Sequence, residues 1–374
     1  MSADFTEALR LYYSTQFPYQ LIYNWLDYKE APEVRFVNRE FSFTLPGDIY
    51  IRYLSFEDSL DFKHALVKKL PIKIDAGAIY NINPKLHRAF PNDFKPIQRE
   101  LIFDVDISDY NDVRTCCTES QICQKCWPLM SIGAKILNSI LTKEFGFKHL
   151  LFVFSGRRGF HCWVCDKEAR LLTAEARRAI ADYFALIQGG ANLVKRVELD
   201  ATKPLHPMVT KALNIIDEQF EDLMVDKQDF LSNDHLIQNV IDLTGDENKD
   251  LQPRLQANCR LHKSSSQDCW NAIKKTSQEH RPRRGRYNYF LQEVKLQHCF
   301  PRLDTHVTRG MNHLLKLPFC VHPKTGNVCV PIDIKAIDGF RLEQVPNIKD
   351  LTREKLDPFV KIFKEFCENL SESS

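Results

Sequence analysis

Two aspartates lie two residues apart in the apolar segment Leu101–Ile107, whose sequence is Leu-Ile-Phe-Asp-Val-Asp-Ile. If this segment is a strand, its two-residue period puts Asp104 and Asp106 on one face and Phe103 and Val105 on the other. Neighbouring carboxylates repel each other unless a cation lies between them, and oxygen ligands are those that Mg²⁺ or Mn²⁺ prefers. The pair is a candidate divalent-metal site, and acids at a solvated strand end are the competing interpretation.

Four cysteines follow within eleven residues, namely Cys116, Cys117, Cys123 and Cys126. The N-terminus lacks the basic and apolar blocks of a secretory signal, so the thiols are expected in a reducing compartment, where clustered cysteines indicate metal before disulfide. Four thiolates complete a tetrahedral Zn²⁺ set and leave no open ligand position, so such a zinc ion would be structural. Four free buried thiols are the alternative.

The segment Ser155-Gly-Arg157-Arg158-Gly-Phe-His161 joins two expected strands through a turn flanked by glycines. Glycines let the backbone approach an anion closely, and the arginine guanidinium matches phosphate oxygens. His161 shares a strand face with Trp163, so on its own it would be interpreted as a core histidine. The two arginines beside it favour a phosphate site.

Further candidates lie near the C-terminal end of the sequence. Asp304 continues an apolar segment and is a candidate third metal carboxylate, and Lys316 and His322 could add positive charge to a polyphosphate site. Each of these has an ordinary surface explanation when taken alone. Cys162 and Cys165 resemble a second Cys-x-x-Cys pair but would point to opposite faces of a strand, so they are expected in the core.

The elements that must position these residues alternate between strands and helices. Pro46-Gly47 between two alternating segments indicates a hairpin. Strands are expected at 41–45, 49–53, 73–80, 101–107, 150–154, 160–165 and 328–332, and helical patterns at 5–30, 129–144, 172–188 and 355–370. This mixture predicts an α/β (mixed α+β) sheet domain.

Residues 205–285 have helical patterns and almost no strand alternation, which predicts a helical insertion subdomain. The strand-rich pattern is expected to resume near Tyr287. The predicted organisation is a catalytic domain of residues 1–204 and 286–374, with a zinc motif at 116–126, interrupted by the insertion.

The charge of the whole chain is nearly balanced, with 51 Lys and Arg against 49 Asp and Glu in 374 residues. A net charge of +2 argues against a uniformly basic nucleic-acid-coating domain, so any polyanion must be met by a local patch. One basic cluster, Arg281–Arg286, could contact phosphates or serve as a nuclear address, and a solvated loop is the alternative. The hydrophobic content of 44% excludes a disordered chain, and no apolar run approaches the roughly 18 residues of a membrane span.

Together, and in this order, the motifs resemble those of the catalytic (small) subunit of eukaryotic DNA primase, a family of the archaeo-eukaryotic primase superfamily. The matching blocks are Asp104-x-Asp106, the four-cysteine segment, Ser155 to His161, Arg302-Leu-Asp304, Asn312-His-Leu-Leu-Lys316 and Val321-His322-Pro-Lys-Thr-Gly326. The resemblance covers nearly the whole chain and is weakest over residues 205–285. It implies the archaeo-eukaryotic primase fold, with a structural zinc motif and an inserted helical subdomain.

The resemblance also implies roles for individual residues. Two Mg²⁺ or Mn²⁺ ions would be bound by Asp104, Asp106 and Asp304. The triphosphate of the incoming nucleotide would be held by Ser155, Arg157, Arg158, His161, Lys316 and His322. Contacts to the nucleotide or to the initiating end are assigned to Glu40, Arg52 and Asp75.

The implied activity is that of a DNA-directed RNA polymerase that makes short RNA primers de novo on single-stranded DNA from ribonucleoside triphosphates, by two-metal-ion nucleotidyl transfer. The implied partners are a large regulatory primase subunit with an iron–sulfur cluster, DNA polymerase alpha and its accessory subunit, in the nucleus. Two alternatives remain: a repair polymerase that only extends existing primers, and a non-catalytic, zinc-stabilised nucleic-acid-binding subunit.

Overall fold

A computed structural model describes residues 3–189, 193–245, 249–282 and 284–372 of the chain. The chain divides into two compact units. Unit 1 comprises Met1–Asp104, Phe147–Asp182 and Asp304–Ser374, and unit 2 comprises Val105–Gly146 and Tyr183–Leu303. In the part of the chain that the model describes, no helix is both long and apolar enough to cross a membrane.

Two sheets provide the framework of the candidate site. Sheet A has the order β2 (Ile49–Leu54), β1 (Arg39–Leu45), β3 (Lys73–Tyr80) and β4 (Pro96–Gln98), with β8 (Leu315–Lys316) also paired to β3. Sheet B has the order β5 (Leu101–Asp106), β7 (Gly159–Val164), β6 (Leu150–Phe154) and β9 (Pro331–Ile332). The boundary between the two units falls inside β5, after Asp104.

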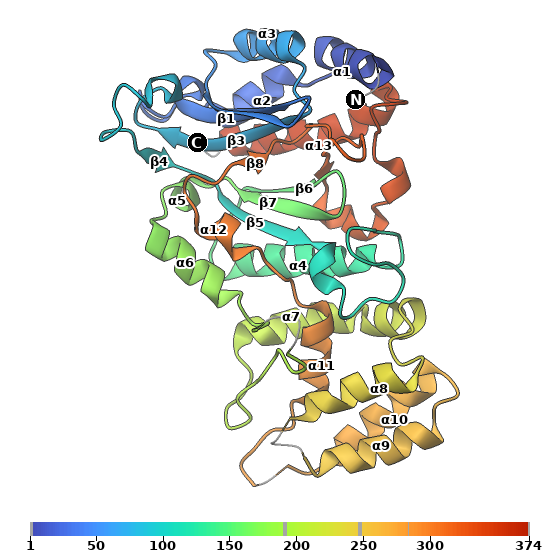
Figure 1. Cartoon of the computed structure of the whole chain (residues 1–374). Helices are drawn as coiled ribbons and strands as arrows, with labels where there is room; N and C mark the ends of the chain where they lie inside the picture. The colour runs from blue at the N-terminus through green and yellow to red at the C-terminus, as the bar shows by residue number, and fades with distance from the viewer. Residues whose placement is uncertain (1–2, 190–192, 246–248, 283, 373–374) are drawn as a thin grey trace. The chain divides into compact units, whose positions relative to one another are not determined.

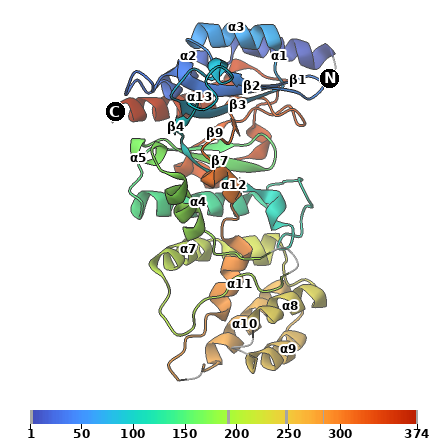
Figure 2. The same cartoon turned by 60° about the vertical axis from the view of Figure 1, so that its left-hand side comes forward.

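Helices cover the sheets of unit 1, and both views show α1 and α3 together on one side of sheet A (Figure 1, Figure 2). The α-helices of this unit are α1 (Ala3–Thr15), α2 (Tyr19–Leu26), α3 (Ser59–Lys69), α5 (Lys167–Arg170), α6 (Ala174–Tyr183, whose last residue belongs to unit 2), α12 (Thr305–Arg309) and α13 (Arg353–Glu372). Its 3₁₀ turns are η1 (Phe36–Asn38), η2 (Pro84–Leu86), η7 (Ile334–Gly339) and η8 (Leu342–Gln344).

The hairpin predicted at Pro46-Gly47 is confirmed, because β1 and β2 pair in antiparallel register from Leu45–Ile49 onward. Gly47 has φ of +81°, which a residue without a Cβ adopts at no steric cost. Phe62 of α3 is fully buried under this sheet and anchors an aromatic cluster. Its ring contacts those of Phe17, Tyr19, Phe36, Phe41 and Phe56.

Beneath β3, three buried arginines surround one buried carboxylate, that of Glu100. Glu100 is fully buried and accepts hydrogen bonds from Arg39 (2.9 and 3.0 Å) and Arg99 (3.0 Å). A third buried arginine, Arg177, donates to the backbone carbonyl oxygen of Glu100 at 3.1 Å. Burial alone would raise the pKa of Glu100, but the two paired arginines outweigh it and hold that pKa well below its ordinary value.

Replacing Glu100 with alanine should lower the free energy of unfolding by about 3–5 kcal/mol, because Arg39 and Arg99 would remain buried without a counter-charge. Urea denaturation followed by circular dichroism measures the effect. The matched control is Glu7→Ala, whose side chain is 79% exposed beside Arg10, so its loss should be below about 1 kcal/mol. A loss as small in Glu100→Ala as in the control would show that water reaches the arginines.

Unit 2 is mainly helical. Its helices are η3 (Ile107–Tyr110), α4 (Trp127–Lys143), α7 (Pro207–Asp217), η4 (Glu221–Lys227), α8 (Asp234–Ile241), η5 (Asp242–Thr244), α9 (Leu251–Leu261), α10 (Ser266–Glu279) and α11 (Phe290–Cys299). α9 packs on α10, and α7 packs on both α4 and α11. The described residues of the segment predicted to be a helical insertion, 205–285, are helical where they have regular structure, and the segment belongs to unit 2.

Three expected elements differ from the structure. The strand pattern does not resume near Tyr287: α11 follows, because Phe290, Val294 and Gln297 are buried at helical spacing. The strand expected at 328–332 is reduced to β9, since the N–H of Val328 donates to the carbonyl of Pro346 instead. The helix expected at 172–188 begins at Ala174 and ends at Tyr183. Arg283 of the basic cluster and residues 246–248 lie outside the described residues.

Candidate active site

The alternation predicted for β5 is confirmed. Phe103 and Val105 are fully buried, whereas Asp104 and Asp106 are partly exposed. Asp106 ends the strand and caps η3, because its Oδ1 accepts from the backbone N–H of Ser108 (2.9 Å) and from the Ser108 hydroxyl (2.8 Å). The two carboxylates therefore project from one face at the end of a strand whose other face is buried.

Asp304 lies beside Asp104, although the two are far apart in the chain. The backbone N–H of Asp304 donates to the carbonyl of Asp104 at 3.0 Å. The Asp304 carboxylate then caps α12 by accepting from the N–H of His306 at 3.0 Å. This main-chain contact places the third predicted carboxylate next to the first.

His161 faces these acids from β7. Its Nε2 is 3.8 Å from Oδ1 of Asp104, which is too long for a hydrogen bond. Burial, and then the charges of Lys316 and Lys73, lower the pKa of His161 to about 3, so the imidazole is neutral near pH 7. Its Nδ1 is buried and has no hydrogen-bond partner within the described ranges. A buried polar atom without a partner is the kind of group that a ligand satisfies.

The turn between β6 and β7 is shaped for close approach to an anion. Ser155 and Gly159 close it, since the N–H of Ser155 donates to the Gly159 carbonyl (2.9 Å) and the N–H of Gly159 donates to the Ser155 hydroxyl (3.2 Å). Gly156 has φ of +84°, and a Cβ there would lie 2.8 Å from the Cβ of His322. Only glycine fits this position, which brings Arg157 and Arg158 to the surface of unit 1 next to His322.

Basic residues from separate segments converge around His322. The ammonium of Lys316 donates to the Ser155 carbonyl at 3.0 Å, and the Thr325 hydroxyl donates to the Gly156 carbonyl at 2.8 Å. Burial, and after it the charges of Lys316, Arg157, Lys324 and Arg158, lower the pKa of His322 to about 3. The cluster predicted from two distant motifs is thus brought together, and it favours an anion.

The pKa of His322 predicts a pH dependence of stability. An unfolded histidine titrates near 6.5, so between that pH and about 3 the unfolded chain binds a proton that the folded chain does not. The folded state therefore loses stability as pH falls through this window. His322→Gln should reduce the loss between about pH 7 and pH 5 by about 1 kcal/mol, measured by urea denaturation.

Exposed His64 on α3 provides the control, because His64→Gln removes an imidazole from the same unit without removing a buried one. An equal pH dependence in wild type, His64→Gln and His322→Gln would mean that water or an anion reaches His322 in the free protein.

Glu40 and Arg52 form a bidentate pair across β1 and β2. The fully buried Glu40 carboxylate accepts from Nε (3.0 Å) and Nη2 (3.2 Å) of Arg52. It also accepts from the hydroxyl of Tyr80 at 3.2 Å. The hydrogen bond to Glu40 raises the pKa of Arg52, which keeps that guanidinium charged and fixed in place.

Asp75 lies on β3 directly opposite Lys316 of β8. Its carboxylate forms an ion pair with Lys73 (3.0 Å) and accepts from the Ser42 hydroxyl (3.0 Å). This register joins the N-terminal strands to the basic cluster. Lys73 and Ser42 are further members of the candidate site that the sequence did not point out. Strand alternation could have indicated Lys73, because it puts Lys73 and Asp75 on one face of the strand.

His313 is a further residue to which the sequence analysis gave no role. Burial, and then the charge of Arg99, lower its pKa, while the negative charges of Asp304 and Asp75 act in the opposite direction. His313 is therefore close enough to Asp304 and Asp75 for both carboxylates to influence its protonation.

The four predicted zinc cysteines come together in unit 2. Among the described residues they are the only group of three or more candidate ligands whose ligand atoms all lie within 4.8 Å of one another. The sulfur of Cys123 is 3.6 Å from that of Cys116 and 3.9 Å from that of Cys126. A tetrahedral zinc ion with bonds of about 2.3 Å needs sulfurs about 3.8 Å apart, so the cluster fits a structural zinc ion.

Two further residues support the zinc motif. The side-chain amide of buried Gln228 donates to the sulfur of Cys116 (3.4 Å) and to the carbonyl of Lys125 (2.8 Å). The guanidinium of Arg114 donates to the carbonyl groups of Glu119 and Gln121 and lies 4.0 Å from the sulfur of Cys126. Arg114 lies two residues before Cys116 in the sequence, so its contact with the motif is local. The contact of Gln228 could not be predicted from the sequence near the cysteines, because Gln228 comes from the distant helical segment.

Comparisons with known proteins identify a family and several relatives with similar sequences. A family model described as DNA primase small subunit matches residues 103–334. The DNA primase small subunit of Schizosaccharomyces pombe is 38% identical over 358 residues, which cover 93% of this chain and 78% of the relative. That of Drosophila melanogaster is 38% identical over 359 residues (93% and 81%), and that of Saccharomyces cerevisiae is 37% identical over 382 residues (97% and 91%).

Proposed function

Since the chain belongs to the eukaryotic DNA primase small subunit family, we propose roles for the individual residues of its site. The chain is a catalytic subunit, a nucleotidyltransferase that synthesises primers. As such a subunit it acts in a primase complex on a DNA template. The comparisons favour this function over an extension-only repair polymerase and over a non-catalytic scaffold.

Asp104, Asp106 and Asp304 are proposed to hold two divalent metal ions, Mg²⁺ or Mn²⁺. When bound, such ions activate the 3′-hydroxyl and neutralise the charge of the leaving pyrophosphate. Support comes from the shared face of Asp104 and Asp106 and from the hydrogen bond that joins Asp304 to Asp104. Among the described residues, the carboxylate oxygens of the three do not form a group within 4.8 Å like that of the cysteine sulfurs.

Ser155, Arg157, Arg158, His161, Lys316 and His322 are proposed to hold the triphosphate of the incoming nucleotide. Gly156 lets the turn approach the phosphates, and the guanidinium and ammonium groups supply fixed positive charge. His161 and His322 are neutral, so they donate or accept single hydrogen bonds rather than add charge. Phosphoryl transfer depends on positioning and charge stabilisation, and none of these groups needs to shuttle a proton.

Arg52 and Asp75 are proposed to contact the nucleotide or the initiating end of the primer. Glu40 makes four hydrogen bonds to neighbouring groups, so its role is to hold Arg52 in position. Lys73, paired with Asp75, lies in the same set and can move to a phosphate when substrate binds.

The first bond is proposed to form between two ribonucleotides on single-stranded DNA, which distinguishes a primase from an enzyme that only extends primers. The further partners are proposed to be a large regulatory subunit with an iron–sulfur cluster and DNA polymerase alpha with its accessory subunit, in the nucleus. The catalytic domain is proposed to comprise residues 1–204 and 286–374 around an insertion of residues 205–285, and the two compact units have other boundaries.

Acids and bases come together in unit 1, and this observation carries the assignment of the metal residues. Asp304 is hydrogen-bonded to Asp104, His161 lies 3.8 Å from Asp104, and Lys316 and Lys73 are close enough to His161 to lower its pKa. Manganese binding measured by electron paramagnetic resonance tests it, because Asp304→Asn should weaken binding by about tenfold or more. Asp357→Asn, on the exposed face of α13, is the control that should bind manganese like wild type. Equal manganese affinity in both variants would remove Asp304 from the metal site.

A further inference from the structure

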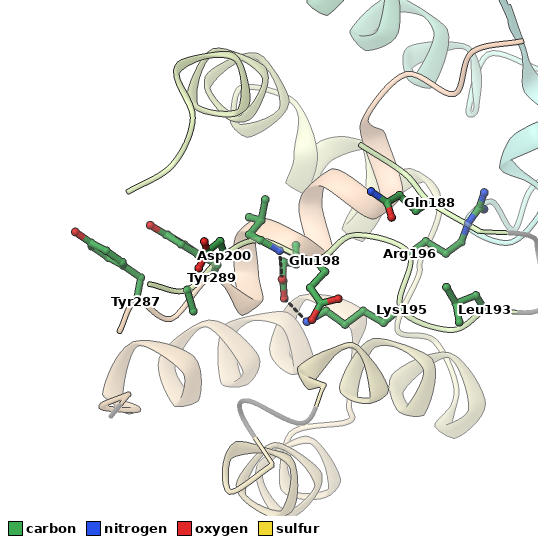
Figure 3. A pocket seen from close by; sticks show the side chains of 11 residues that line it. Gln188, Leu193, Lys195, Arg196, Glu198, Asp200, Tyr287 and Tyr289 are labelled. Carbon is green, nitrogen blue, oxygen red and sulfur yellow. Dashed lines mark hydrogen bonds and ion pairs between the residues drawn. The ribbon is translucent and has the colours of Figure 1, made fainter. Parts of the chain in front are cut away.

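A cavity of about 440 Å³ in unit 2 has no part in the proposed chemistry. Lys195, Glu198 and Asp200 line it from one segment, and Tyr287 and Tyr289 from another. Figure 3 shows the two tyrosines side by side at one end, with Arg196 and Gln188 toward the other. Its volume is in the range of ligand sites.

The two tyrosine rings form a stacked pair. Their centroids are 5.3 Å apart and their planes are inclined by only 8°. Tyr289 is nearly buried, and its hydroxyl donates to the carbonyl of Lys203 at 2.8 Å. Tyr287 is 47% exposed, so one face of its ring is supported by Tyr289 while the other remains open for a further planar group.

The backbone fixes this pair before any ligand binds. The N–H of Tyr287 donates to the carbonyl of Ala201 at 2.8 Å, and the side chain of Asn288 donates to the carbonyl of Ser277 at 2.9 Å. A prearranged platform of this kind loses little conformational entropy on binding.

The charge beside the platform is positive. Arg284 and Arg286 are exposed and lie three residues and one residue before Tyr287, and no acidic residue occurs between His280 and Gln292. On the cavity side, Glu198 and Asp200 are exposed, but Asp200 is paired with Lys203 at 2.9 Å. Carboxylates repel a phosphate but accept hydrogen bonds from the amino group of cytosine, so the two sides suit different parts of a nucleotide.

We propose that this surface binds single-stranded nucleic acid, with a base stacked on Tyr287 and the adjoining phosphates on Arg284 and Arg286. An open aromatic face beside cations is the arrangement by which proteins bind single strands. Template DNA and nascent RNA share this chemistry, and both belong to the reaction of the family. The inference does not depend on the proposed metal residues, because binding here needs neither nucleotide nor divalent ion.

Fluorescence anisotropy of the full chain with labelled oligodeoxycytidylate and oligocytidylate of about 16 nucleotides tests this proposal, without nucleotide or divalent metal. Tyr287→Ala should weaken binding by about 5- to 100-fold, whereas Tyr287→Phe, which keeps the ring, should bind like wild type. A larger loss for the DNA probe assigns the surface to the template, and a larger loss for the RNA probe to the product.

The arginines are tested by salt dependence between about 50 and 200 mM. In the double variant Arg284→Gln with Arg286→Gln, the slope of the logarithm of the binding constant against the logarithm of the salt concentration should be shallower by about 1.4. The control double variant, Arg260→Gln with Lys275→Gln, makes an equal charge change on exposed positions of α9 and α10 and should keep the wild-type slope. Wild-type affinity in Tyr287→Ala, or equal slopes in the two double variants, would overturn the proposal. The proposal would also be overturned if Tyr287→Ala bound nucleic acid normally but bound the large subunit more weakly than wild type does. That result would assign the surface to a protein partner.

Discussion

Asp106→Ala should abolish primer synthesis, lowering the rate by about three orders of magnitude or more, because it removes one of three carboxylates proposed to hold the catalytic metals. Asp106 also caps η3 through Ser108, so the alanine variant loses about 1 kcal/mol of stability as well. Asparagine caps a helix about as well as aspartate. Asp106→Asn therefore removes the charge and keeps the cap.

The assay is primer-free incorporation of a labelled ribonucleotide on a single-stranded homopolymer with Mn²⁺. We expect no product from Asp106→Ala or Asp106→Asn, and wild-type product from Asp93→Asn, an exposed loop position. Normal synthesis by Asp106→Asn would exclude Asp106 from the metal set. If the wild-type chain itself extends only a supplied primer, initiation requires a partner subunit.

Removing the zinc motif should have the largest effect on stability. Structural zinc sites contribute to folding directly, with binding free energies of about 10–16 kcal/mol in small peptides. Cys126, the buried member of the cluster, is the ligand whose loss should be least tolerated. Cys126→Ala should bind no zinc and should lower the melting temperature of the protein markedly.

Elemental analysis and thermal unfolding, with and without a chelator, measure this loss. Cys367→Ala on α13 is the matched control, since Cys367 lies outside the cluster and should leave zinc content unchanged. At a temperature where Cys126→Ala remains folded, manganese binding by the carboxylates should persist, because four cysteine ligands leave a zinc ion no open position for catalysis. Loss of manganese affinity in step with zinc would argue against a purely structural role.

Local patterns in the sequence predicted the elements that depend on local physics. Asp104 and Asp106 were placed on one strand face by alternation, and Gly47 marked the hairpin because glycine adopts a positive φ at the lowest steric cost. Cys162 and Cys165 were expected in the core and both are fully buried. The helix at Phe290 was missed because aromatic residues near Tyr287 resemble a strand when only short windows are considered.

Long-range register could not be predicted from patterns of this kind. Nothing in the sequence around Asp75 shows that it pairs with Lys316, since the register is set by how β8 docks on β3. The same holds for Gln228, whose contact with Cys116 depends on the path of a helical segment more than a hundred residues away. The resemblance to a known family indicated which residues belong to the candidate site. The structure shows which neighbouring residues hold them in position.

The arginines buried beneath β3 have a consequence for nucleotide affinity. Arg39, Arg99 and Arg177 lie around Glu100, and Arg99 also donates to the carbonyl groups of Ala76 and Gly77, next to Asp75. After burial itself, the charge of Arg99 is the largest influence that lowers the pKa of His313, so this positive potential extends among the carboxylates. Dissolved ions screen exposed charges strongly but interior ones weakly. Part of the attraction for a polyanionic substrate should therefore persist at ionic strengths that suppress the contribution of the surface arginines.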